Sequence, residues 1–167
     1  MPPASRRSAG TSILPRSGRR DRGWIAVIVV VGVDDSERSA VAARKACRLA
    51  RLLDAEVHAV HVGHVPAAML AALAGLPAGA SEFSEAQRAA VWDLVGPVLD
   101  AGGAPVTRID LDGYPADALV EYAESVQAGL IVVGSRGRGH LASLVLGSTS
   151  HRVANQTRCD VLIAKGD

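Results

Sequence analysis

Aromatic side chains are scarce in this sequence, where Phe, Trp and Tyr together make up 3% of the 167 residues. The whole set consists of Trp24, Phe83, Trp92, Tyr114 and Tyr122. Proteins that read nucleic acids by base stacking need aromatic platforms, so the scarcity argues against that function. Cysteine is also rare, because only Cys47 and Cys159 occur, without the paired spacing of a metal site. We expect both to be reduced thiols in a cytoplasmic protein.

A strong net charge is lacking too, because basic and acidic residues almost cancel to +1. The charges are nevertheless unevenly placed, with six arginines and one aspartate in residues 1–22. The rest of the chain is mildly acidic, so no nucleic-acid partner is expected. Residues 1–23 are rich in Arg, Ser, Gly and Pro and show no helical or strand period. We predict a disordered tail there, followed by one domain over residues 24–167.

The apolar run over residues 24–33 is too short to cross a bilayer, so no membrane partner is expected. Basic residues before such a run are typical of export signals, and the paired Arg19 and Arg20 leave a twin-arginine signal as an alternative. Asp34 and Asp35 follow the run directly, without a small-residue cleavage site. We therefore favour a strand that is buried on both faces.

Short apolar segments alternate with helical segments along the rest of the chain. Strands are predicted within residues 24–33 and at 56–62, 106–112, 130–134 and 161–164, and helices at 37–53, 81–99, 115–126 and 143–155. Ser36 is expected to cap the first helix, whose buried face is predicted as Ala40, Ala43, Cys47, Ala50 and Leu53 or their near neighbours. This alternation requires right-handed crossovers and a parallel sheet. We predict an α/β three-layer sandwich with a five-stranded parallel sheet and four main helices.

In open parallel sheets, ligands bind beyond the carboxyl ends of the strands, where the strand order reverses. A glycine-rich segment, residues 134–150, follows the fourth predicted strand at this edge. Glycines and a helix N-terminus let backbone amides approach an anion, and Ser148, Thr149 and Ser150 add hydroxyl donors. Arg136 and Arg138 would balance phosphate charge, although a solvated loop pair is the alternative. The pattern points to a nucleotide.

The spacing Gly134-x2-Gly137-x9-Gly147-Ser148 lies between an Ile-Val-Val strand and a Cys-Asp-Val-Leu-Ile strand. It resembles the nucleotide-binding subclass of the universal stress protein (UspA) family, as does the opening Val-Gly-Val-Asp-Asp-Ser36. The resemblance covers about residues 25–165. It implies an adenine nucleotide alpha hydrolase-like fold with strand order 3-2-1-4-5. It also implies a homodimer that pairs the last strand through Val161, Leu162 and Ile163.

The resemblance further implies which residues contact an adenine nucleotide. Asp34 matches the acid near the adenosine, with the backbone of Gly32 and Val33 beside it, and Val62 matches the position whose backbone meets the adenine edge. The ribose and phosphate loop and the phosphate cradle are matched by Val133, Gly134, Arg136, Gly137, Gly147, Ser148, Thr149 and Ser150. The implied ligand is ATP, or AMP or cAMP, with Mg²⁺ or Mn²⁺ held through the phosphates. Asp35 stands where the family commonly has Gly, and this extra carboxylate leaves the nucleotide and the metal open.

Three other nucleotide motifs share parts of this pattern and fit it less well. Gly137-Arg-Gly-His-Leu-Ala142 matches G-x-G-x-x-A, but that motif belongs after the first strand of its unit. The Gly-Lys-Ser/Thr of a Walker loop is missing from the sequence. Gly32-Val-Asp-Asp-Ser36 lacks the leading serine and second glycine of adenylating pyrophosphatases.

The remaining polar residues carry weaker signals. His58 and His61 lie three apart on a predicted strand, which places them on opposite faces and gives each a structural role. His64, His140 and His151 are not paired with a nucleophile by any pattern. Asp110-Leu-Asp112-Gly113 lacks the further ligands of a calcium loop.

We predict a stress-response regulator that binds ATP or another adenine nucleotide and uses occupancy to bias a partner or an oligomer. No catalytic residue is predicted, because no base stands in a recognisable relation to a water or a hydroxyl. A slow metal-dependent ATPase is one alternative. The other is an interaction module that has lost nucleotide binding, in which Asp35 and the arginine-rich tail matter more than the glycine-rich segment.

Overall fold

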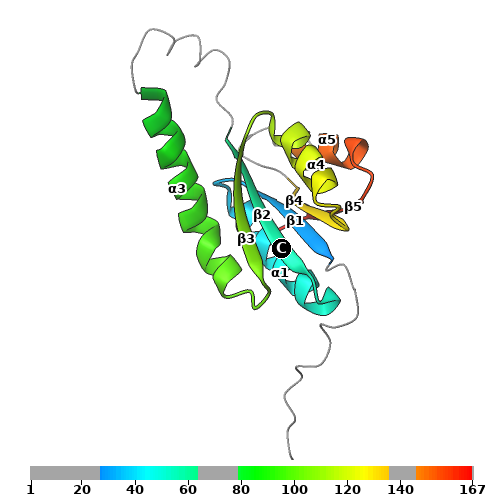
Figure 1. Cartoon of the computed structure of the whole chain (residues 1–167). Coiled ribbons are helices and arrows are strands. Elements are labelled where there is room, and N and C mark those ends of the chain that lie inside the picture. The colour runs from blue at the N-terminus through cyan, green and yellow to red at the C-terminus, as the bar shows by residue number, and fades with distance from the viewer. Residues whose placement is uncertain (1–26, 64–78, 136–145, 167) are drawn as a thin grey trace, which may run out of the picture.

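A computed structural model describes residues 27–63, 79–135 and 146–166, with the backbone alone for residues 79–84 (Figure 1). The predicted tail and the stretch containing Arg136 and Gly137 lie outside these residues. The strands are β1 (Ile28–Val33), β2 (Glu56–Gly63), β3 (Val106–Asp112), β4 (Leu130–Gly134) and β5 (Asp160–Ala164). The helices are α1 (Glu37–Leu53), α3 (Gly79–Asp100), α4 (Pro115–Ser125) and α5 (Ser148–Gln156).

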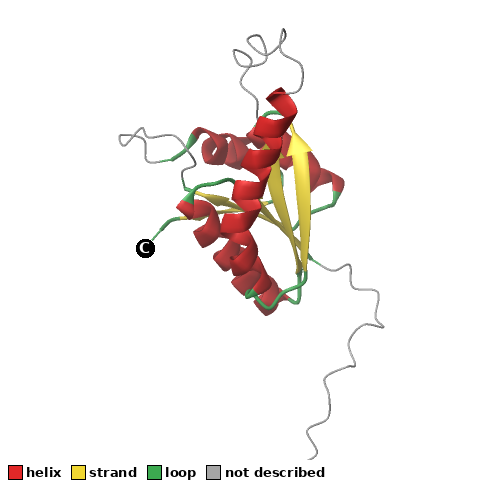
Figure 2. Cartoon of the chain, turned by 90° about the vertical axis from the view of Figure 1, so that its left-hand side faces the viewer, coloured by secondary structure: helices red, strands yellow, loops and turns green. Residues whose placement is uncertain are grey.

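The strands form one parallel sheet in the order β3-β2-β1-β4-β5. Helices α1 and α3 cover one face and α4 and α5 the other, so that the sheet is the middle layer in Figures 1 and 2. The predicted fold class, the strand order 3-2-1-4-5 and the four helices are all confirmed.

The β-branched sequence of β1 explains why this strand lies at the centre of the sheet. Val29 and Val31 pack toward α1 and α3, whereas Val30 packs toward α4, and all three are fully buried. Alternating side chains of one strand therefore serve two separate cores. The prediction of a strand buried on both faces is confirmed.

Helix α1 packs closely on the sheet because its buried face carries small side chains: Ser39, Ala42, Ala43, Ala46, Cys47 and Ala50. Two expectations for this helix are wrong. Leu53 is 52% exposed, because the helix ends there and Asp54 turns the chain with a φ of 54°. Ser36 occupies the N-cap position, but its hydroxyl bonds to the Asp34 carboxylate instead of to the helix amides.

Helix α5 begins later than the predicted residue 143. The N-cap is Gly147, with an extended backbone at a ψ of 156°, and the helix starts at Ser148. The Gly147 amide donates a hydrogen bond to the Ser135 carbonyl at 2.8 Å, which keeps Gly147 out of the helix. Residues 143–145 lie outside the described part of the chain.

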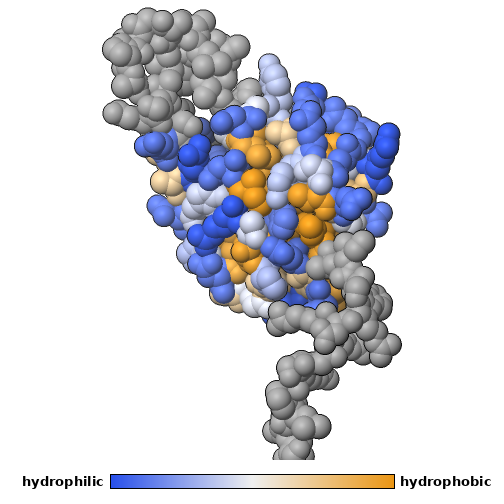
Figure 3. Space-filling model, viewed as in Figure 1, coloured by the Kyte–Doolittle hydropathy of each residue, from blue (hydrophilic) through white to orange (hydrophobic). Residues whose placement is uncertain are grey.

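The two edges of the sheet differ in polarity. On β3 the side chains of Thr107, Arg108 and Asp110 are exposed, whereas Val161, Leu162 and Ile163 of β5 are half-buried and apolar. Figure 3 shows hydrophobic side chains reaching the surface in strips that hydrophilic ones separate. Exposed charged side chains on an edge strand disfavour pairing with another chain, so β5 is the edge better suited to it.

Candidate functional site

The strand order reverses between β1 and β4, and the carboxyl ends of these strands bring several predicted site residues together. Residue Ser135, directly after β4, connects three segments at this edge. Its amide donates to the Ala164 carbonyl of β5 and its carbonyl accepts from Gly147, both at 2.8 Å. The Ser150 hydroxyl donates to the Gly134 carbonyl at 2.6 Å. The start of α5 is therefore bound to the end of β4.

Asp34 lies just beyond β1, and its carboxylate is held in one orientation. Oδ1 accepts hydrogen bonds from the hydroxyls of Ser36 and Ser39, both at 2.5 Å, and from the Ser36 amide at 3.0 Å. The Asp34 amide in turn donates to the Ser39 hydroxyl at 2.8 Å. Ser36, the N-cap of α1, and Ser39 in its first turn thus orient the carboxylate.

Arg38 is a residue of this edge that the sequence patterns did not single out. It lies in the first turn of α1, and its Nη1 donates to the Ser135 hydroxyl at 3.1 Å, across 97 positions of sequence. This contact spans the reversal point and puts a guanidinium beside the end of β4. The sequence offered one signal for this role, the position of Arg38 in the first helical turn after a buried strand. That signal is weak, because an arginine at such a position is ordinarily a solvated helix residue.

The first amides of α5 form a donor set at the same edge. By helix geometry the amides of Ser148, Thr149 and Ser150 have no carbonyl partner within the helix, and the first internal bond runs from His151 to Gly147 at 2.9 Å. The first turn contains no acidic residue. A helix N-terminus of this kind favours an anion.

Buried polar side chains gather at this edge. Among the described residues, the buried polar or charged ones are Ser39, His61, Ser135 and Ser150. Ser39 and His61 are hydrogen-bonded to residues at the end of β1, and Ser150 is hydrogen-bonded to the last residue of β4. Ser135 directly follows β4 and accepts a hydrogen bond from Arg38. A buried polar group costs free energy unless it has a partner, so a cluster of four indicates an edge built to hold backbone segments in place.

The ends of β1 and β2 each contact a further element of the fold, β1 through packing on α4 and β2 through a hydrogen bond to the residue after β3. A Cβ added to Gly32 would lie 2.9 Å from Leu119 of α4, so this glycine lets α4 pack on the sheet. Gly63, after Val62, accepts a hydrogen bond from the Gly113 amide at 3.2 Å, which joins the ends of β2 and β3.

The two strand histidines face opposite layers, as the spacing predicts. His61 is 4% exposed, and its Nδ1 lies 3.2 Å from the Val33 carbonyl oxygen. His58 points to α4, where its Nδ1 lies 2.8 Å from the Tyr122 hydroxyl, and its Nε2 is 3.4 Å from Glu56. Burial, together with the Glu56 carboxylate, raises the pKa of Tyr122. Both histidines have structural contacts, as expected.

The described residues offer no dedicated metal centre, because no three His, Cys, Asp or Glu side chains come together among them. Within the same ranges, no helix is both long and apolar enough to cross a membrane. The polar groups that the structure places at this edge are hydroxyl, carboxylate and backbone amide groups.

Fold and site together define a doubly wound α/β protein with a polar edge and a helix N-terminus where the strand order reverses. Residues 28–165 match the universal stress protein family, and the chain belongs to that family.

A universal stress protein of Methanocaldococcus jannaschii is 33% identical over 142 residues, which cover 82% of this chain and 81% of the relative. The solved structure of universal stress protein UspA from Lactobacillus plantarum has the same fold, with a TM-score of 0.72 at 24% identity, and covers 83% of this chain and 97% of that one. A solved universal stress protein in complex with cAMP is 30% identical, with a TM-score of 0.60 over 84% of this chain and 97% of that one.

Proposed function

We propose that this protein binds an adenine nucleotide at the carboxyl ends of β1 and β4 and acts as a nucleotide-dependent regulator in the stress response. The observation that carries the proposal is the oriented carboxylate of Asp34 together with the acid-free N-terminus of α5, both at the edge where the strand order reverses. The related structure in complex with cAMP supports an adenine ligand.

The chemistry of the edge suggests how the nucleotide lies. The phosphates face the first amides and hydroxyls of α5 at Gly147, Ser148, Thr149 and Ser150. The ribose lies toward the oriented carboxylate of Asp34, and the base reaches the ends of β1 and β2 at Val33 and Val62. Gly32, Val133 and Gly134 complete the described part of the site, and Arg136 and Gly137 belong to it through their match to the family motif.

The ligand is ATP, AMP or cAMP, and a divalent ion accompanies ATP through its phosphates. The amides of α5 favour phosphate, whereas Asp34 and Asp35 add negative charge beside it. Mg²⁺ or Mn²⁺ would reduce the repulsion between these acids and a triphosphate, because such ions prefer carboxylate and phosphate oxygens. The nucleotide preference therefore depends on the metal.

We further propose a homodimer that pairs the β5 edges. The Ser135 amide is bonded to Ala164, the last residue of β5, and its carbonyl to Gly147 at the start of α5. One residue thus contacts both the phosphate end of the site and the strand that would pair with the partner. Occupancy of the site is in this way transmitted to the dimer edge.

The test is thermal unfolding with and without ATP, ADP, AMP and cAMP, each with and without Mg²⁺. A nucleotide at about 100 times its dissociation constant adds about 2.7 kcal/mol to the free energy of unfolding, which raises the Tm by several degrees. The rise should disappear in Gly147→Val, whose side chain would enter the phosphate end. Gly166→Val is the matched control, since a Cβ there meets nothing within 4 Å. No rise with any of the four nucleotides would refute the proposal.

A further inference from the structure

We propose that His61 is a positioning residue for the nucleotide site, which holds the ends of β1 and β2 at the spacing that the base requires. The inference rests on the proposed function. No sequence motif assigns this role, because the sequence pattern around His61 is that of an ordinary core histidine in a strand.

The position of His61 links the two strand ends. His61 is paired in register with Val33 of β1 on one side and with Asp110 of β3 on the other. Its Nδ1 lies 3.2 Å from the carbonyl oxygen of Val33, the last residue of β1. Asp34 directly follows Val33 in the sequence, and Val62 directly follows His61. One side chain therefore joins the residues that precede both expected contacts to the nucleoside.

The chemistry of the contact requires a donor at Nδ1. A carbonyl oxygen accepts hydrogen bonds only, so the imidazole carries its hydrogen on Nδ1 in this arrangement. His61 is 4% exposed, and a buried carbonyl or ring nitrogen that loses its partner is not compensated by water. The hydrogen bond therefore resists separation of the two strand ends.

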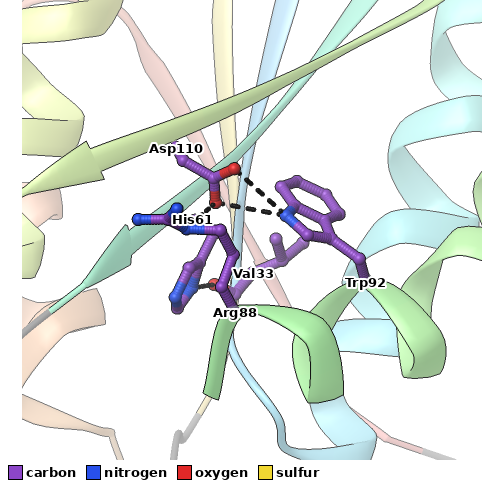
Figure 4. Close-up of polar contacts among 5 residues, drawn as sticks. All are labelled: Val33, His61, Arg88, Trp92 and Asp110. Atoms are coloured by element: carbon purple, nitrogen blue, oxygen red, sulfur yellow. Dashed lines mark hydrogen bonds and ion pairs between the residues drawn. The ribbon is translucent and has the colours of Figure 1, made fainter. Parts of the chain in front are cut away.

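Helix α3 covers this contact with a polar cluster (Figure 4). The Trp92 Nε1 donates to Asp110 Oδ1 at 3.1 Å, and Arg88 Nε lies 3.4 Å from the same oxygen. Figure 4 shows Trp92 and Arg88 converging on Asp110, while the imidazole of His61 is directed at the Val33 carbonyl. Trp92 and Arg88 thus contact Asp110, whereas His61 contacts Val33.

His58 is a matched control within the same strand. It is also a partly buried, hydrogen-bonded histidine, but it faces α4, and its Nδ1 contacts the Tyr122 hydroxyl. The Tyr122 contact joins α4 to the sheet, the Glu56 contact lies at the start of β2, and neither touches the carboxyl ends of β1 and β2. Substitution of His58 reports what the loss of a histidine contact costs the fold alone.

The experiment compares His61→Leu, His61→Asn and His58→Leu at a temperature where each variant is folded. In His61→Asn the amide nitrogen takes the place of Nδ1 as the donor. We expect His61→Leu to weaken binding of adenosine, AMP and ADP about tenfold each, because the lost hydrogen bond lies at the base end of the site. His61→Asn should bind within about threefold of the wild type, and His58→Leu should lower the Tm without changing the dissociation constants.

Two binding outcomes would overturn the inference: wild-type affinities in His61→Leu, or an equal loss of affinity in His58→Leu. A loss of affinity that grows from adenosine to AMP to ADP would also overturn the inference, because the weakened contacts would then be those between the phosphates and α5.

A second readout needs no nucleotide and separates this inference from the proposed function. The Asp34 amide, which donates to the Ser39 hydroxyl, should exchange its hydrogen faster in His61→Leu than in His58→Leu. Equal exchange rates would overturn the positioning role. If the wild type binds no nucleotide while the exchange differs as expected, only the proposed function and the role in binding fail.

Discussion

At the scale of single residues, the site depends on hydrogen bonds that orient Asp34. Ser39 is the central partner, because its hydroxyl donates to the carboxylate and accepts from the Asp34 amide. Ser36 donates to the same carboxylate oxygen but does not accept from that amide. Loss of the Ser39 hydroxyl would therefore leave the Asp34 amide without a partner, whereas loss of the Ser36 hydroxyl would not.

Substitution of Ser39 by alanine tests this difference. Ser39 is buried, so Ser39→Ala removes a donor and leaves the Asp34 amide without its partner. The free energy of unfolding should fall by about 1–3 kcal/mol, as measured by urea denaturation. Ser36→Ala should cost only about 0.5–1.5 kcal/mol, because it removes a donor and leaves the amide satisfied. A larger loss in Ser36→Ala than in Ser39→Ala would contradict the role assigned to Ser39.

At the scale of elements, the sequence patterns predicted the five strands and the four helices because these depend on local periodicity. β-branched runs marked β1 and β4, and Pro115 marked the first residue of α4, as the structure confirms. The wrong predictions concern the ends of helices α1 and α5, because tertiary contacts determine where a helix begins and ends. Gly147 is held out of α5 by the carbonyl of Ser135, a bond that no local pattern records.

The turn after α3 depends on a close approach to α1. A Cβ added to Gly102 would lie 2.5 Å from Cys47 Sγ and 3.0 Å from the Leu99 carbonyl. Gly102→Ala should therefore lower the free energy of unfolding by about 1–3 kcal/mol, because α1 and α3 must move apart. Gly166→Ala, with open space around its Cβ, should leave that free energy unchanged.

Cys47 provides a direct reporter of this movement. Its side chain is 1% exposed, and burial raises the pKa of the thiol against an opposing effect of Arg51. In the wild type at pH 8, Cys47 should react with a thiol reagent far more slowly than the half-buried Cys159. Gly102→Ala should accelerate the reaction of Cys47. An unchanged rate, together with unchanged stability, would show that the turn accommodates the methyl group.

At the scale of the whole molecule, the contrast between the two sheet edges leads to a prediction about assembly. Val161→Lys places a charge on the apolar β5 edge, and an edge lysine blocks pairing with another strand. If the proposed dimer forms, we expect the variant to be monomeric by light scattering at concentrations where the wild type is dimeric. Thr107→Lys on the opposite edge should leave the dimer intact, since β3 already exposes charged side chains.

The assembly experiment needs a check on folding, because Val161 also packs partly against the core. The circular dichroism spectrum and the urea midpoint of Val161→Lys establish that the subunit remains folded. A folded Val161→Lys that stays dimeric would show that the subunits associate through another surface.

The sequence by itself determined the fold class, the family and the segments that meet at the site, because periodicity, glycine spacing and caps are local properties that one chain records. Only the tertiary structure decided which side chains hold those segments together. Arg38 meets Ser135 across 97 positions and His61 meets Val33 across 28, and both contacts arise from the pairing of β1 with its neighbours in the sheet. A hydrogen bond between distant residues depends on register and burial, which local patterns do not encode.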